Sequence, residues 1–230
     1  MLPVPQADTG NGKGINHMIK IYSIRVSVFS TNCYVVQNTE TKEGFILDPG
    51  DYEEKILEFL REKEVKLTAI YLTHGHLDHM MAAERIKAEY KVPVYCHETE
   101  LSVLADPVQN LTSRFMREGY VFTAAEGLKD GAGFTAAGVS VKLLHTPGHT
   151  PGGCCYYLPE NGVLFSGDTL FYHSIGNTEF PGGSMGTLSR SIREKLYTLP
   201  EETVVYAGHG EETTIGTEKR ENPFVPATEV

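Results

Sequence analysis

The sequence of 230 residues lacks the features that suit a membrane span or a nucleic-acid partner. Its longest apolar runs are a few residues, whereas a helix needs about 20 to cross a bilayer. Cations are scarce, because 20 lysines and arginines stand against 30 aspartates and glutamates, for a formal net charge of -10. Nucleic-acid binding needs cationic groups that displace counterions. We therefore expect a protein that binds neither a membrane nor a nucleic acid.

Cysteines are few, and their spacing shows no metal or redox motif. The four cysteines form no CxxC pair, and Cys154 and Cys155 are adjacent in a strand-like segment, where neighbours point to opposite faces. We expect buried free thiols. The start of the chain has no apolar core of a signal peptide, which favours a cytoplasmic location. Residues 1–17 are predicted to be a disordered leader or a cloning remnant, and residues 18–230 a single domain.

The most informative feature that is present is the run THGHLDH, which follows an apolar, strand-like segment at residues 67–72. Its imidazoles and carboxylate suit zinc and similar cations, whereas calcium sites are built from oxygen. His74 and His76 are two residues apart and would face different sides of a helix, so we place them in a loop. Asp78 and His79 then begin a helix, HLDHMMAAERIKAEY. Two groups of ligands that point in different directions indicate two metal ions.

Three further ligand-type side chains lie far downstream, and each follows a hydrophobic segment and a glycine. His149 lies in the loop HTPGHTPGG, Asp168 ends VLFSGD, and His209 ends VVYAGHG. Strand ends commonly deliver side chains to a site at one sheet edge, and a neighbouring glycine permits close approach. The joint pattern predicts that these residues complete the metal site.

These motifs occur in an order that resembles the metallo-β-lactamase superfamily, and more closely its glyoxalase II-like branch, in a short form. The sequence motifs that carry the resemblance are LDPGD, THGHLDH, HTPGHTPGG, FSGDTLF, AGHG and ENPF. The resemblance extends from about residue 18 onward. It implies a four-layer αβ/βα sandwich of two mixed β-sheets flanked by helices. It also implies two metal ions. His74, His76 and His149 would bind one ion, Asp78, His79 and His209 would bind the other, and Asp168 would bridge the two.

The chemistry of such a site can be argued from the ligands. Two divalent cations about 3.5–4 Å apart share a water and lower its pKa toward about 7. The resulting hydroxide can attack a carbonyl while the metals stabilise the developing oxyanion, so no serine or cysteine nucleophile is needed. Asp78 and Asp168 are the predicted catalytic carboxylates. Zinc is the expected metal, with iron or manganese as alternatives, and the partner is a small-molecule substrate.

Supporting residues are predicted around the ligands, because a metal-bound imidazole usually donates its other N–H to a carboxylate or carbonyl. Asp48 in LDPGD is the candidate, although an aspartate before Pro-Gly is also ordinary turn chemistry. Thr73 and Thr169 could brace the site or merely cap it. His145 is assigned a supporting role, since Pro-Gly between it and His149 rules out helical spacing.

The substrate is less well defined by the sequence. The loop after Asp168, LFYHSIGNTEFPGG, contains no lysine or arginine that would pair with an anionic substrate. Tyr172, His173 and Asn177 in this loop are the predicted substrate contacts. The 21 residues after His209 are too few for the basic helical extension of glyoxalase II proper. These two observations weigh against strong specificity for glutathione thioesters.

Three functions remain open at this point. The leading interpretation is hydrolysis of a small thioester or related ester at a dinuclear site. The second is an iron-dependent persulfide dioxygenase, which would use only a His, His, Asp set on one iron. The third is a protein that binds metal without catalysis, although structural zinc sites are usually closed by four ligands, often cysteines.

The remaining elements follow from hydrophobic periodicity. A helix is predicted at residues 52–65 and another at 184–199, with hairpins turning at residues 137–138 and 160–162. Residues 98–119 are predicted to be mainly helical, with Phe115 and Met116 in the core.

Overall fold

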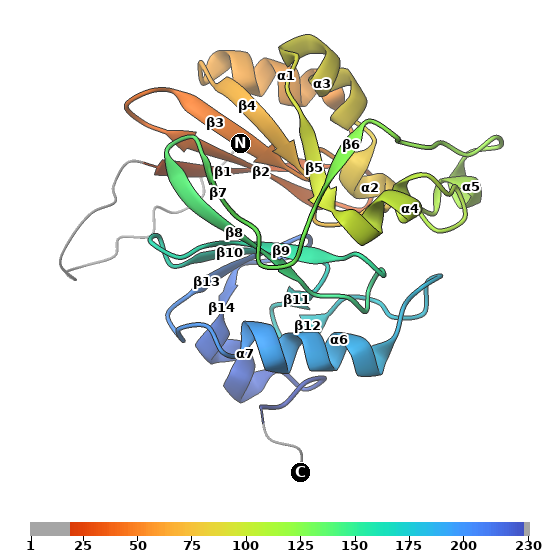
Figure 1. Cartoon of the computed structure of the whole chain (residues 1–230), viewed down its shortest axis with the longest axis vertical. Helices are drawn as coiled ribbons and strands as arrows, with labels where there is room; N and C mark the ends of the chain where they lie inside the picture. Colours follow the sequence, from red (N-terminus) through yellow and green to blue (C-terminus); the bar gives the residue numbers. More distant parts are fainter. Residues whose placement is uncertain (1–18, 228–230) are drawn as a thin grey trace.

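The structure is a computed structural model that describes residues 19–227, so the predicted leader at residues 1–17 lies outside the described residues. Two six-stranded sheets face each other, as Figure 1 shows. In spatial order the first sheet is β1 (Ile19–Val26), β2 (Thr31–Asn38), β3 (Glu43–Leu47), β4 (Lys66–Tyr71), β5 (Val94–His97) and β6 (Ala125–Leu128). The second is β14 (Thr213–Thr214), β13 (Val204–Ala207), β10 (Val163–Gly167), β9 (Cys154–Leu158), β8 (Val139–His145) and β7 (Gly133–Ala136).

Both sheets are mixed. Strands β1 to β3 pair antiparallel, and β3 to β6 pair parallel through helical crossovers. Strands β7 to β10 form an antiparallel meander, and β10 then pairs parallel with β13. The predicted hairpins at residues 137–138 and 160–162 are therefore confirmed. A small separate sheet, β11 (Leu170–Phe171) with β12 (Ser174–Ile175), follows β10.

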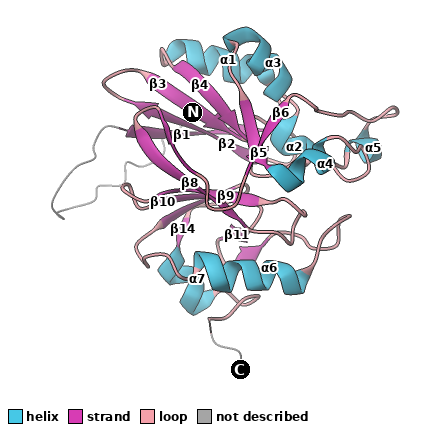
Figure 2. Cartoon of the chain, viewed as in Figure 1, coloured by secondary structure: helices cyan, strands magenta, loops and turns pink. Residues whose placement is uncertain are grey.

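Helices cover the outer face of each sheet, which gives four layers (Figure 2). Helices α1 (Glu53–Glu62) and α3 (Ala83–Tyr90) cover the first sheet. Helix α6 (Met185–Ser191), continued by a π-helical turn (Ile192–Leu196), and α7 (Ile215–Glu221) cover the second. The predicted four-layer sandwich is confirmed.

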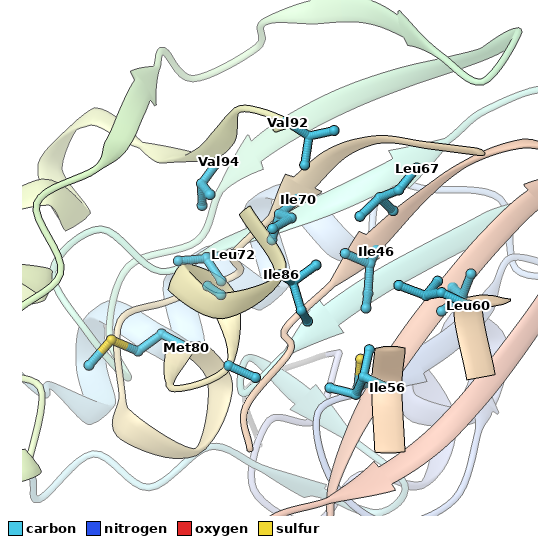
Figure 3. Packing of buried hydrophobic residues seen from close by; sticks show 14 of the residues in the cluster. Ile46, Ile56, Leu60, Leu67, Ile70, Leu72, Met80, Ile86, Val92 and Val94 are labelled. Carbon is cyan, nitrogen blue, oxygen red and sulfur yellow. The ribbon is translucent and has the colours of Figure 1, made fainter. Parts of the chain in front are cut away.

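Alternation along the strands explains why there are three apolar cores. In β3, Ile46 packs toward α1 and α3, whereas Phe45 and Leu47 pack between the sheets. Figure 3 shows the core between the first sheet and its helices, where Ile46 and Ile70 of the strands pack with Ile56 of α1 and Ile86 of α3. Successive strand residues point to opposite faces, so a strand that is buried on both faces contributes side chains to two cores.

The four cysteines are buried and free, as predicted. Cys154 lies in the core between the sheets and Cys155 in the core beneath α6, on opposite faces of β9. Within residues 19–227, no helix is both long and apolar enough to span a membrane.

Two helical predictions are wrong in part. The helix expected at residues 76–90 is two helices, α2 (Leu77–Met80) and α3, because the Ala82 amide donates to the carbonyl of Pro49 rather than to a helical partner. Residues 98–119 hold only a 3-10 turn (Glu98–Glu100), α4 (Leu101–Leu104) and α5 (Thr112–Phe115).

The prediction that Phe115 and Met116 belong to the core is also wrong. Their exposed fractions are 60% and 38%. Leu111 has a φ of 67°, which begins a tight turn into α5, and α5 ends as the backbone becomes extended at Met116. The short helix therefore projects these side chains outward instead of packing them against a sheet.

Candidate metal centre

The seven candidate ligands come from strand ends and one short helix, and they meet at one edge of the two sheets. His74 and His76 lie in the loop after β4, and Asp78 and His79 lie on α2. The others follow strands of the second sheet: His149 after β8, Asp168 after β10 and His209 after β13.

The ligands form three overlapping groups, in each of which the ligand atoms lie within 4.8 Å of one another. The groups are His74, His76 and His149; His74, His79 and Asp168; and Asp78, His79 and His209. The first and third are the two sets that the sequence resemblance implies.

Asp168 lies between these two sets. Its Oδ2 is 3.5 Å from Nε2 of His149 and 3.6 Å from Nε2 of His209, and its Oδ1 is 3.4 Å from Nε2 of His79. A single carboxylate thus faces ligands of both sets, as a bridging residue would.

Several ligand-type atoms in the cluster are buried without a hydrogen-bond partner. They are Nε2 of His74, His76 and His79 and Oδ1 of Asp168. Unpaired buried polar atoms are costly, and a cluster of them in one place needs an explanation. Imidazole nitrogens and a carboxylate oxygen that face one another fit divalent metal ions.

Hydrogen bonds at Nδ1 orient three of the candidate histidine ligands. Nδ1 of His79 donates to Asp48 at 3.0 Å, that of His149 to the carbonyl of Asn177 at 2.6 Å, and that of His209 to the carbonyl of Phe29 at 3.2 Å. In a neutral ring the proton on Nδ1 leaves the lone pair on Nε2. When neutral, these three rings therefore present the lone pair of Nε2 to the centre of the cluster, as metal ligands do.

The charges of the cluster are set by burial and by opposite charges, in the absence of metal. Burial and neighbouring imidazoles lower the pKa of His74 and His76, which keeps both rings neutral. Burial alone would lower the pKa of His79, but three neighbouring carboxylates, chiefly that of Asp78, raise it to about 10. Burial would likewise raise the pKa of Asp78, but His79 and hydrogen bonds lower it. Without metal, the cluster thus pairs an ionised Asp78 with a protonated His79 beside the neutral rings of His74 and His76.

Asp48 joins the first sheet to the cluster. Its Oδ1 accepts the amide N–H of Thr73 at 2.7 Å, and its Oδ2 accepts the Thr73 hydroxyl at 2.7 Å as well as Nδ1 of His79. The Thr73 hydroxyl also lies 3.1 Å from Nδ1 of His74. The structure thus places the predicted pair, Asp48 and Thr73, in contact with two candidate ligands.

Comparison with known proteins accounts for this arrangement. A family model described as the metallo-beta-lactamase superfamily matches residues 26–209. The chain belongs to this superfamily.

Two of the similar proteins carry hydrolase names. The chain is 42% identical over 203 residues to the probable metallo-hydrolase YqgX of Bacillus subtilis, covering 87% of this chain and 94% of the relative. It is 37% identical over 216 residues to the hydroxyacylglutathione hydrolase GloC of Haemophilus influenzae, covering 90% and 98%. The crystal structure of BLEG-1 B3 metallo-beta-lactamase is similar, with 38% identity, a TM-score of 0.85 and coverage of 90% and 99%. The superfamily and the ligand cluster support a metal-dependent hydrolase.

The other predicted supporting residues touch the ligand loops and not the ligands. The hydroxyl of Thr169 lies 2.9 Å from that of Thr146. His145 stacks on His97 with ring centroids 3.7 Å apart, and its Nε2 donates to the carbonyl of Pro151 at 3.0 Å. His145 therefore holds the loop that carries His149.

The predicted substrate contacts lie mostly away from the cluster. The amide of His173 donates to Glu218 at 3.0 Å and its ring is 3.7 Å from Glu221, so its contacts are with α7. Tyr172 is half exposed and packs on His173. Asn177 reaches the cluster through its backbone carbonyl, which His149 uses, while its side chain accepts the amide of Glu179.

Two supporting residues were missed by sequence reasoning. The hydroxyl of Thr31, at the start of β2, donates to Oδ2 of Asp78 at 2.6 Å. Glu100 is fully buried, and its carboxyl group accepts hydrogen bonds from the two loops that carry His76 and His149. A single threonine before a strand and a glutamate in ETE give no signal on their own, since their partners are distant in sequence.

Proposed function

We propose that this protein hydrolyses a small thioester or related ester at a dinuclear metal centre, with zinc as the expected metal. His74, His76 and His149 would hold one ion, and Asp78, His79 and His209 the other. The observation that carries the proposal is the position of Asp168, whose carboxylate faces both sets of ligands. The relative named hydroxyacylglutathione hydrolase supports the choice of a thioester.

The chemistry requires water, a carbonyl and a leaving thiol, and no oxidant. Bound divalent ions lower the pKa of a coordinated water and polarise a carbonyl. The C–O bond forms as water adds, the C–S bond breaks, and the products are a carboxylic acid and a thiol. The side chains contribute by orientation: the hydrogen bonds at Nδ1 of His79, His149 and His209 hold three rings with Nε2 toward the cluster.

The presence of a second group of facing ligand atoms favours hydrolysis over the dioxygenase alternative. A mononuclear iron centre needs two histidines and one carboxylate. Here Asp78, His79 and His209 form a further group of facing ligands, and Thr31 and Asp48 support it through hydrogen bonds. Such a second set offers a place for a second ion, which a single-iron centre would not need.

The test is metal content together with an anaerobic assay. We expect two metal ions per chain and thioester hydrolysis without oxygen. Asp168→Ala should abolish turnover and reduce bound metal, whereas Glu62→Ala, an exposed carboxylate on α1, should change neither. One iron with oxygen uptake on a persulfide would establish the dioxygenase instead. Fully loaded protein with neither activity would favour the binding-only interpretation.

A second hydrolytic substrate class follows from the likeness to BLEG-1, whose structure is described as a B3 metallo-beta-lactamase. Opening of a β-lactam also adds water across a carbonyl. A chromogenic cephalosporin assayed beside the thioester compares the two classes directly, and we expect the larger kcat/KM for the thioester.

A further inference from the structure

The cation that the loop after Asp168 lacks is supplied by a different segment. Arg114 lies in α5, and its guanidinium carbon is 5.4 Å from the centre of the Phe180 ring. Phe180 in turn packs edge-on against two candidate ligands, His76 at 5.5 Å and His149 at 6.1 Å between ring centroids. One aromatic ring therefore separates Arg114 from the candidate metal centre.

Arg114 is free to accept a ligand. Its side chain is exposed, and within residues 19–227 no carboxylate lies within salt-bridge distance of it. The surrounding protein is acidic overall, with a formal net charge of -10, so an exposed arginine near the site stands out as a positive group. A guanidinium on an aromatic face keeps its planar donors available for a carboxylate.

The next residue, Phe115, reaches the other side of the site. Its exposed ring packs edge-on against the exposed ring of Phe29, with centroids 5.4 Å apart. The carbonyl of Phe29 accepts the hydrogen bond from His209, a ligand of the second set. Consecutive residues of α5 thus connect, each through one aromatic ring, to both ligand sets, which places this short helix beside the ligand cluster.

We propose that Arg114, stacked on Phe180, binds a carboxylate of the substrate, while Phe29, Phe115 and Phe180 contact its apolar part. This inference rests on the proposed function and names its substrate class: thioesters whose thiol carries a free carboxylate. It replaces the expectation, drawn from the cation-free loop and the short C-terminal end, that the protein lacks strong specificity for glutathione thioesters.

The length of the substrate follows from the two ring contacts. Arg114 lies no farther from the His76 ring than the two centroid distances together, about 11 Å. A peptide extends about 3.3–3.6 Å per residue. A carboxylate two or three residue lengths from the scissile carbonyl, as in a short peptide thiol, can therefore reach the guanidinium.

The test compares two thioesters with the same acyl group on the metal-loaded enzyme. One carries glutathione, which has free carboxylates, and the other carries N-acetylcysteamine, which is neutral. Loss of a hydrogen bond to a charged group, about 1.5–3 kcal/mol, corresponds to roughly 10–150-fold. Arg114→Gln should lower kcat/KM by this factor for the glutathione thioester, mainly through KM, and leave the neutral thioester within about twofold.

Two further variants distinguish a specific role of the Arg114 guanidinium from a general effect of removing a positive charge. Arg117→Gln removes an equal charge from the exposed residue three positions on and should change neither substrate. Arg114→Lys keeps the charge but loses the planar donors, and should retain only part of the affinity. Equal losses for both thioesters in Arg114→Gln, or no loss for either, would overturn the proposal.

Binding of S-methylglutathione, which is not hydrolysed, gives a readout independent of turnover. Titration calorimetry on metal-loaded protein should show about tenfold weaker binding for Arg114→Gln than for Arg117→Gln. If neither thioester is hydrolysed but this difference remains, the carboxylate site stands and the proposed function fails. If both are hydrolysed and Arg114→Gln changes neither turnover nor binding, the function stands and the carboxylate site fails.

Discussion

Replacement of Glu100 by glutamine is expected to weaken metal binding, although Glu100 is not a ligand. The residue is fully buried, and burial raises its pKa to about 7 despite the hydrogen bonds that it accepts. Its Oε1 accepts the amide of Gly75 at 2.7 Å, and its Oε2 accepts the hydroxyl of Thr150 at 3.0 Å and the amide of Gly152 at 2.8 Å. Gly75 lies between His74 and His76, so Glu100 joins both loops of the first ligand set.

The size of the effect follows from these three hydrogen bonds. An amide NH2 in place of either oxygen faces a backbone N–H, of Gly75 in one orientation and of Gly152 in the other. A buried donor left without an acceptor costs about 1–3 kcal/mol, part of which is offset because the neutral amide carries no buried charge. Glu100→Ala leaves all three donors without an acceptor, which costs on the order of 3–9 kcal/mol.

Metal affinity is the readout that separates positioning from mere stability. Loss of groups that orient the ligands typically lowers metal affinity by about 10–100-fold. We expect a loss in this range for Glu100→Gln, measured by competition with a chromophoric chelator, together with a lower urea midpoint for unfolding. Glu98→Gln, an exposed glutamate two residues earlier, serves as the control. Wild-type affinity and midpoint in Glu100→Gln would refute the reasoning.

Three further outcomes are expected. Gly208→Ala should lower bound metal and activity, because a Cβ there would collide with Oδ1 of Asp168; Gly133→Ala, where nothing lies within 4 Å, should be neutral in the same assays. Asp48→Asn should lower metal affinity by about 10–100-fold, since its amide opposes the donor of His79 or of a neighbouring group, and a chelator titration that matches wild type would contradict this. Removal of metal should lower the melting temperature, because a ligand at 100 times its Kd adds about 2.7 kcal/mol, or roughly 5–10 °C at this size; equal melting curves with and without chelator would rule out metal-linked stability.

The fold was predictable because its signals are local and repeated. Alternating residues such as Phe45 and Ile46 predict a strand buried on both faces, and the structure packs them into different cores. Leu57 and Leu60 show the helical spacing of α1. The candidate ligands were also accessible, because their motifs directly follow apolar, strand-like segments of the sequence.

The parts that failed depend on contacts between distant segments. Phe115 and Met116 were assigned to the core from their apolar character, but α5 is too short to bury them. Glu100 gave no signal because its partners lie 25 and about 50 residues away. Arg114 was overlooked because it lies in neither of the two segments considered for a substrate-binding cation, the loop after Asp168 and the C-terminal end. In each case tertiary contact decided the role of the residue.

The residues that hold the metal ligands and those proposed to bind the substrate lie in different parts of the fold. The candidate ligands extend from strand ends, and buried carboxylates such as Asp48 and Glu100 hold them, so a change there disturbs several hydrogen bonds at once. Arg114 and Phe115 lie instead on a four-residue helix, and Phe180 on a loop, where substitution costs little stability. In this arrangement the candidate metal ligands and their supporting contacts lie at the edge of the sheets, whereas the residues proposed to bind the substrate lie on short segments. Related proteins can therefore share the metal centre and differ in substrate. On the proposal that Arg114 binds the substrate carboxylate, the residue at this position is a better guide to the substrate than the metal motifs are.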